Sequence, residues 1–190
     1  MKETPSQTAG PYVHIGLTPN LSGVGGVYDA DLGAEMTTGP VRGEEIVLHG
    51  VIRDGMGAII KDAVVEVWQA DADGLFGADG DPNFTGWGRC ACDMETGEYR
   101  FETVKPGPVP YPDGRMQAPH VTVWIVARGI NLGLQTRAYF EDEENGEDPV
   151  LKRIEHRDRV ETLIARREAD GVYRFDIVLQ GDGETVFFDV

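Results

Sequence analysis

His120 is the residue best placed to do chemistry in this sequence. It stands where a Pro- and Gly-rich loop that begins at Lys105 meets an apolar run over residues 121–127. Side chains two positions apart on a strand lie on the same face. A second histidine at position 122 would therefore aim two imidazoles at one metal ion, but Thr122 stands there. Metal or substrate chemistry and a purely structural histidine both remain open for His120.

Cys90 and Cys92 are the other residues that could bind a metal or form a covalent bond. Two strand neighbours on one face hold their Cα atoms near the upper limit of disulfide geometry, with their side chains parallel. A two-ligand metal site would lack its usual companions. We therefore expect free, partly buried thiols.

The segments that position these residues predict a mainly β fold, an antiparallel β-sandwich with one short helix and long loops. A turn is expected at Asp54–Gly55 and another over 181–184. Residues 71–90 and the acidic run 141–148 are expected to be loops, the second of them solvated. Strands are expected over 46–52, 63–70, 98–104, 121–127, 135–140 and 173–180, and residues 185–189 close a C-terminal hairpin.

One helix is expected over 158–169. Asp158 can cap it together with Glu161, and the apolar side chains Val160, Leu163 and Ile164 form a narrow stripe. Residues 1–44 have no sustained period and predict an ordered arm or a series of turns rather than a helix. The arm ends in the alternating apolar residues Tyr12, Val13, Ile15 and Leu17, so we expect it to pack on a partner chain, with residues 45–190 as the sandwich domain.

Composition limits the partners that this chain can have. Its 190 residues carry 33 acidic and 17 basic side chains, a formal net charge of −16. Nucleic acids and anionic membranes are polyanions, so neither is an expected partner. The chain has no apolar run of the roughly 18 residues that span a membrane, and no apolar N-terminal segment typical of a secretory signal. We expect a cytoplasmic protein and, if it assembles, a less acidic companion chain.

Several segments together carry a family resemblance. They are TPSQTAGPYVHIGL (4–17), VEVWQADADG (65–74), TVKPGPVP (103–110), APHVTVWIVARGIN (118–131), TRAYFEDE (136–143), ETLIAR (161–166) and YRFDIVLQGDGETVFFD (173–189). The chain resembles the intradiol ring-cleavage dioxygenases, and in particular their alpha-type chains. That resemblance implies a β-sandwich core and a heteromer of alpha and beta chains in equal number. The implied reaction is the O₂-dependent opening of protocatechuate to 3-carboxy-cis,cis-muconate with mononuclear non-haem Fe(III), in the β-ketoadipate pathway of aromatic catabolism.

The resemblance also decides how His120 is interpreted. In the family, the beta chain holds the iron through two tyrosines and a His-x-His pair, and the four matching positions are Phe76, Val109, His120 and Thr122. The arginine that assists catalysis matches Gln117, and a shifted alignment would add only Tyr111 as a second ligand. A ferric ion requires several anionic or imidazole donors. We therefore expect a degenerate site with no metal and no catalytic residue in this chain, a structural His120, and Fe(III) bound by the partner beta chain.

Two groups are expected to reach the substrate in the partner's pocket. The first is the turn Thr8, Ala9, Gly10, Pro11 and Tyr12, which in the family's alpha chains approaches the neighbouring iron site; Gly10 allows close backbone approach and Pro11 restricts φ. The second is Arg128, whose guanidinium would bind the substrate carboxylate, with Arg137 as the rival. Two alternatives remain: a self-sufficient intradiol dioxygenase with an altered metal site, and a non-catalytic β-sandwich binding module.

Overall fold

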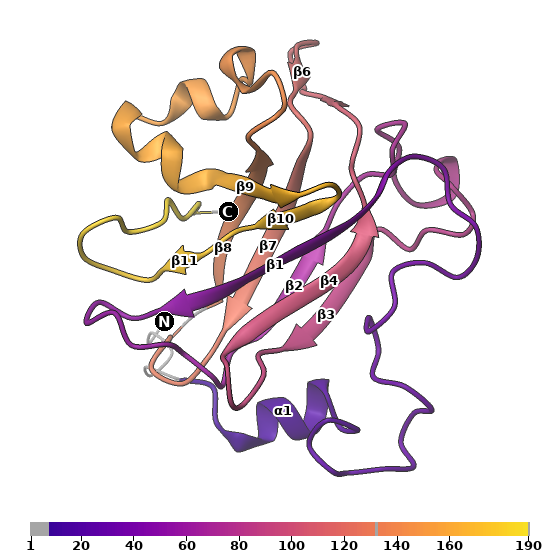
Figure 1. Cartoon of the computed structure of the whole chain (residues 1–190), viewed down its shortest axis with the longest axis vertical. Coiled ribbons are helices and arrows are strands. Elements are labelled where there is room, and N and C mark those ends of the chain that lie inside the picture. Colours follow the sequence, from indigo (N-terminus) through magenta and orange to yellow (C-terminus); the bar gives the residue numbers. More distant parts are fainter. Residues whose placement is uncertain (1–7, 132, 190) are drawn as a thin grey trace, which may run out of the picture.

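The computed structural model describes residues 8–131 and 133–189. Helix α1 (Pro11–Leu17) precedes all the strands, and four short 3-10 helices follow at Gly77–Asp79, Asn145–Glu147, Leu151–Arg153 and Arg157–Leu163. The strands of this part of the chain are β1 (Glu45–Arg53), β2 (Val64–Trp68), β3 (Trp87–Ala91), β4 (Glu98–Val104), β5 (Val109–Pro110), β6 (Met116–Gln117), β7 (His120–Val126), β8 (Leu134–Phe140), β9 (Ile164–Ala169), β10 (Val172–Arg174) and β11 (Ile177–Val178) (Figure 1).

Nine of these strands form one mixed sheet. β1 pairs with β4 along one side and with β10 and β11 along the other, and the sheet continues through β9, β8, β7 and β2 to the edge strand β3. Strands β5 and β6 form a separate two-stranded sheet. The predicted mainly β fold with one short α-helix is confirmed, although β1–β10, β1–β11 and β8–β9 are parallel pairs rather than antiparallel ones.

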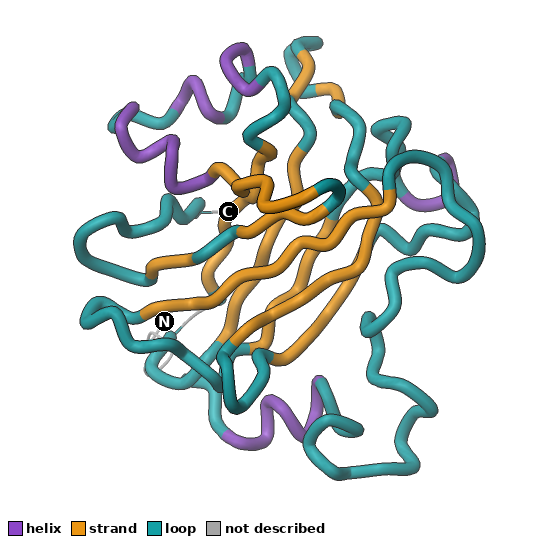
Figure 2. Tube along the Cα trace, viewed as in Figure 1, coloured by secondary structure: helices purple, strands orange, loops and turns teal. Residues whose placement is uncertain are grey.

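The main core lies between two halves of the sheet that face each other. The half with β1 and β4 crosses in front of the half with β2, β7 and β8 in Figures 1 and 2. Leu48 and Phe101 from the front half meet Val65 and Val123 from the back half, and all four are at most 4% exposed. These strands are rich in β-branched and aromatic residues, which suit a pleated, buried surface. The predicted strands over 46–52, 98–104, 121–127 and 135–140 therefore all form.

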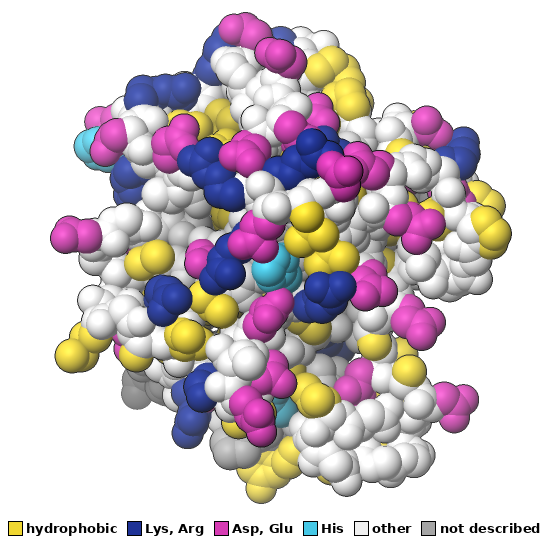
Figure 3. Space-filling model, in the orientation of Figure 1, with side chains coloured by type: hydrophobic (Ala, Val, Ile, Leu, Met, Phe, Trp, Pro, Cys, Tyr) yellow, Lys and Arg dark blue, Asp and Glu magenta, His cyan; other side chains and the backbone are white. Residues whose placement is uncertain are grey.

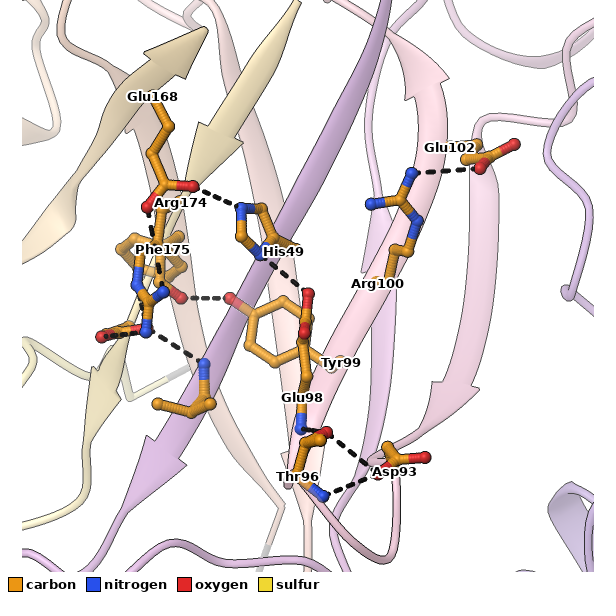
Figure 4. Close-up of polar contacts among 12 residues, drawn as sticks. His49, Asp93, Thr96, Glu98, Tyr99, Arg100, Glu102, Glu168, Arg174 and Phe175 are labelled. Carbon is orange, nitrogen blue, oxygen red and sulfur yellow. Dashed lines mark hydrogen bonds and ion pairs between the residues drawn. The ribbon is translucent and has the colours of Figure 1, made fainter.

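A polar network crosses the outer surface of the front half (Figure 4). The ring nitrogens of His49 on β1 lie 2.8 Å from a carboxylate oxygen of Glu98 and 3.0 Å from one of Glu168. Below this surface, the hydroxyl of the fully buried Tyr99 donates to the carbonyl of Phe175. The contact of His49 with Glu168 connects β1 to β9, and the contact of Tyr99 with Phe175 connects β4 to the segment after β10.

The prediction that residues 1–44 contain no helix is wrong. The turn before α1 places Gly10 in an extended conformation, and Pro11 is the first residue of the helix. Proline is tolerated there because the first N–H groups of a helix have no intrahelical partner, and its fixed φ already suits a helix. The prediction rested on the absence of a sustained period, and a helix of seven residues is too short to show one. Residues 4–7 of the resembling segment lie outside the described residues.

The prediction of a helix over 158–169 is also wrong. The segment forms the 3-10 helix Arg157–Leu163 and then β9, which pairs with β8 through Tyr139–Ile164 and with β10. Asp158 does not cap a helix, since the residue before the 3-10 helix is His156 and no side chain caps it. Sheet pairing satisfies the backbone of residues 164–169, and this tertiary contact overrides the helical pattern.

Three smaller predictions also need correction. Residues 71–90 are not all loop, because β3 begins at Trp87 and pairs with β2; Gly88 inside β3 weakens its sequence pattern. The strand predicted over 173–180 is broken into β10 and β11, and the turn after it is closed by Thr185, whose N–H donates to Val178. In the acidic run, Asp148 is 1% exposed rather than solvated.

Acidic and basic side chains intermix across the face shown in Figure 3. Neither sign forms a continuous patch on that face, as expected where most arginines stand beside a carboxylate. Within residues 8–131 and 133–189, no helix combines the length and the apolarity needed to cross a membrane.

Candidate functional site

The outer face of β7 and β8 carries two of the four residues that match the family's metal site. His120 and Thr122 lie on this face, as their spacing predicts, and pair across the strands with Tyr139 and Arg137. The 3-10 helices of residues 151–163 and the C-terminal segment cover the face. A second apolar cluster, which includes Tyr139 and Leu163, fills part of the space beneath this cover. The site is therefore enclosed between a sheet face and irregular segments.

His120 itself is held as a structural residue. Its ring is 9% exposed, its Nδ1 donates to the carbonyl of Ala118 at 2.7 Å, and its centroid lies 5.3 Å from that of Tyr139. Burial, together with the nearby Arg137 guanidinium, lowers the pKa of His120 to about 4. The imidazole is consequently neutral near pH 7.

The other positions of the metal pattern hold side chains that lack a donor atom for iron or have that atom engaged elsewhere. Val109 is buried on β5 opposite Gln117 on β6. Phe76 stacks on Trp68 with ring centroids 6.1 Å apart. The hydroxyl of Tyr111, the alternative ligand, accepts a hydrogen bond from Arg153 at 2.8 Å. Each residue is therefore engaged in packing or in a hydrogen bond with a neighbouring side chain.

This donor set does not fit an iron ion. One neutral imidazole and one threonine hydroxyl are too few donors for Fe(III), which requires several anionic or imidazole ligands. Throughout the described part of the chain, no group of three or more His, Cys, Asp or Glu side chains is arranged to hold a metal. The two cysteines are free thiols, Cys92 buried and Cys90 partly buried, as the sequence predicts.

A pocket of about 550 Å³ lies between this sheet face and its cover. Its floor includes Thr122 and Arg137, and its cover includes Arg153 and Phe188. Arg137 donates to the side-chain oxygen of Gln117 at 2.8 Å and lies 3.3 Å from the hydroxyl of Tyr139. The rival arginine of the sequence analysis therefore belongs to this pocket.

A second site forms where the N-terminal turn meets the end of β7. Ala9, Gly10, His14, Asp62 and Arg128 line a pocket of about 220 Å³. The two groups that the sequence analysis assigns to the substrate, the N-terminal turn and Arg128, thus lie side by side although more than a hundred residues separate them.

Local hydrogen bonds fix this arrangement. Gly129, at φ +84°, turns the chain directly after Arg128, and its N–H donates to the hydroxyl of Thr8 at 2.8 Å. Glycine adopts such a positive φ without the steric cost that a side chain would add. The Nε2 of His14 lies 2.9 Å from the carbonyl of Asp62 and ties α1 to the same corner.

Arg128 is oriented by a carboxylate. Its Nε donates to Asp62, while its side chain remains 71% exposed. The sequence analysis did not identify Asp62 or His14, because no local pattern marks them: Asp62 only precedes a strand, and His14 lies in a segment not expected to be helical. Tyr12 is 83% exposed and lies on α1, outside the lining of the pocket.

Comparisons with known proteins agree on one family. A family model described as a dioxygenase matches residues 19–181. The chain is 47% identical to the protocatechuate 3,4-dioxygenase alpha chain of Pseudomonas putida, over 100% of this chain and 97% of that one. It is 34% identical to the beta chain of the same-named enzyme of Burkholderia cepacia, over 84% and 75%. The solved 3-chlorocatechol 1,2-dioxygenase of Rhodococcus opacus superposes with a TM-score of 0.60, over 78% of this chain and 65% of that one, at 21% identity, which concerns the fold alone.

Proposed function

The chain belongs to the intradiol ring-cleavage dioxygenase family, and we propose that it is the alpha-type subunit of a heteromer that opens protocatechuate with O₂. The full-length likeness to a protocatechuate 3,4-dioxygenase alpha chain supports the subunit assignment. In this reaction the ring opens between its two hydroxylated carbons and both oxygen atoms enter the product, 3-carboxy-cis,cis-muconate. The partner is a beta chain.

One observation carries the proposal: Arg128 and the turn of Thr8, Ala9 and Gly10 meet around one open pocket at the edge of the fold. A subunit that completes a neighbour's binding site needs such groups at its surface rather than in its interior. Pro11 and Tyr12 follow the turn directly and extend this surface along α1. We assign these residues and Arg128 to the wall of the partner's substrate pocket.

Arg128 has the chemistry to recognise the carboxylate of protocatechuate. Asp62 occupies its Nε, which leaves the two terminal nitrogens to donate to a ligand. A guanidinium can bind a carboxylate through two parallel hydrogen bonds. Asp62 is then a positioning residue, because it holds the guanidinium in place without contacting the substrate.

Iron, on which this family depends, is assigned to the beta chain. The support is the donor set described above, in which Phe76 and Val109 contribute no side-chain oxygen and His120 is bonded to the carbonyl of Ala118. This chain then contributes substrate recognition and no catalytic residue.

The N-terminal arm is assigned to the interface with the partner. Large apolar side chains stand exposed along it, a costly arrangement for a free surface. They include Tyr12 at 83%, Leu21 at 63% and Val27 at 55% exposed. Their burial against a second chain would give the arm the packing that the sequence analysis expects of residues 1–44.

Substitution of Arg128 in the assembled enzyme tests the proposal. In Arg128→Gln we expect KM for protocatechuate to rise about 10-fold or more, the cost of losing a charge-assisted pair. KM for catechol, which lacks the carboxylate, should change little. Arg53→Gln is the control for loss of an arginine, because Arg53 donates to the carbonyl of Gly57 in a turn distant from this pocket. Equal effects of Arg128→Gln on both substrates would rule out the assignment.

A further inference from the structure

The pocket beneath the 3-10 helices is richer in basic side chains than the molecule as a whole. The chain carries a formal charge of −16. The pocket lining nevertheless has three arginines, Arg137, Arg153 and Arg159, against two carboxylates, Glu155 and Asp189. Arginines that line a pocket without a carboxylate partner favour an anionic ligand.

Two of these arginines keep their charge available. Within residues 8–131 and 133–189, no carboxylate oxygen lies within 4 Å of the guanidinium nitrogens of Arg137 or Arg153. Arg137 donates to the neutral amide oxygen of Gln117, and Arg153 donates to the hydroxyl of Tyr111. Arg159, in contrast, pairs with Glu184 at 3.0 Å. Most arginines of the described chain have such a carboxylate partner. Four in this part of the chain do not, and two of these four, Arg137 and Arg153, lie in this one pocket, which points to a ligand that supplies the negative charge.

The rest of the lining favours a ligand with an apolar body. Val150, Ile154, Val186 and Phe188 provide apolar walls. The guanidinium of Arg137 lies 5.9 Å from the ring centroid of Phe188, so charge and apolar surface meet at one point. A volume of about 550 Å³ lies within the range typical of small-molecule sites, roughly 300–1,000 Å³.

We propose that this pocket binds a small organic monocarboxylate with an aromatic or apolar body, whose carboxylate is held by Arg137 and Arg153. Glu155 and Asp189 at the rim disfavour more highly charged anions such as phosphate esters. Thr122, in the place of a metal-binding histidine, leaves room above the sheet and adds a hydroxyl to the lining.

Ligand titration of the full chain tests the proposal, with 4-fluorobenzoate as the probe and fluorine NMR as the readout. We expect saturable binding of one molecule per chain. The uncharged isostere 4-fluorobenzamide should bind at least 10-fold more weakly, because it cannot form the charge-assisted pairs. Acetate, which has the charge without the apolar body, should also bind at least 10-fold more weakly.

Arginine variants locate the binding site. Arg137→Gln and Arg153→Gln should each raise Kd at least 10-fold, whereas Arg53→Gln should leave it within about twofold. Arg153 is exposed and replaceable without disturbing the core, so its variant remains informative if Arg137→Gln does not fold. The proposal is overturned by equal affinity for the acid and the amide, by wild-type affinity in Arg153→Gln, or by the absence of saturation at about 10 mM.

Discussion

His120 begins β7, and Arg128 lies two residues beyond its end. The surroundings of Arg128 suit a ligand-binding residue, whereas those of His120 suit a structural one. Arg128 is exposed, oriented by Asp62, and has nitrogens left for a ligand. His120 is buried, neutral and already bonded to the backbone. The spacing of residues 120 and 122 correctly predicts that they share a face of the strand. The spacing does not show whether His120 binds a ligand, and its contacts in the fold identify it as a structural residue.

The buried state of His120 predicts a specific loss of stability in acid. Its folded pKa of about 4 lies below the ordinary value near 6.5, so between these values the unfolded chain binds the extra proton. Stability should therefore fall as the pH drops from about 6.5 towards 4, with a contribution from His120 of about 2 kcal/mol at pH 5.

The variant His120→Asn, which keeps a donor for Ala118 but does not titrate, should lose less stability between pH 7 and pH 5 than the wild type. Urea unfolding at the two pH values gives this difference. An identical pH dependence in the two proteins would contradict the neutral, buried histidine. Iron content of the assembled enzyme should not change in this variant.

The cysteines give a second prediction at this scale. Burial raises the pKa of both Cys90 and Cys92 to about 12. At pH 8 the reactive thiolate is then a very small fraction of either thiol, so alkylation by iodoacetamide should be at least about 100-fold slower in the native than in the urea-unfolded chain. Mass spectrometry after timed quenching measures both rates, and comparable rates would show that the thiols are not held as described.

At the scale of elements, Asp148 anchors the segment that covers the outer face of the sheet. Its carboxylate accepts from the N–H groups of Ala118, Val150 and Leu151, each at 2.8 Å. It thereby connects the strand entry at residue 118 to the 3-10 helix at Leu151–Arg153. The cover of the pocket depends on one buried carboxylate from a run that looks solvated in the sequence.

Removal of this anchor should be costly. Asp148→Ala leaves buried N–H groups without an acceptor, and we expect a loss of about 3 kcal/mol in the free energy of unfolding. Glu144→Ala, in the same acidic run but exposed, is the control and should change stability by less than about 0.5 kcal/mol. Urea unfolding measures both, and equal effects of the two substitutions would refute the anchoring role of Asp148.

The elements also show how far the sequence predicts this fold. Runs rich in β-branched residues, such as 46–52 and 121–127, identify strands, because these side chains suit a pleated surface with one buried face. Residues 158–169 could not be assigned correctly, since their apolar stripe fits a helix and only pairing with β8 makes part of it a strand. Thr8, Asp62 and Arg128 come from distant segments that meet only in the folded chain. The sequence therefore suggested Thr8 and Arg128 but gave no sign of Asp62.

At the scale of the whole molecule, charge and exposed apolar surface both indicate a chain that functions in an assembly. A formal charge of −16 produces self-repulsion that a less acidic partner would relieve. The exposed side chains of the N-terminal arm, such as Tyr12 and Leu21, would be covered in the same step. Under the proposed function, this chain shapes the substrate pocket and recognises the substrate, and the partner chain holds the iron.

Iron content, measured together with oxygen uptake on protocatechuate, tests this division most directly. The chain is expressed alone and together with a beta chain, and each purified product is assayed. We predict less than about 0.1 iron per chain and no oxygen uptake for the chain alone, because one neutral imidazole cannot hold Fe(III), and about one iron per alpha–beta pair with full uptake for the assembly. Stoichiometric iron and substrate-dependent oxygen uptake by the chain alone would contradict the account.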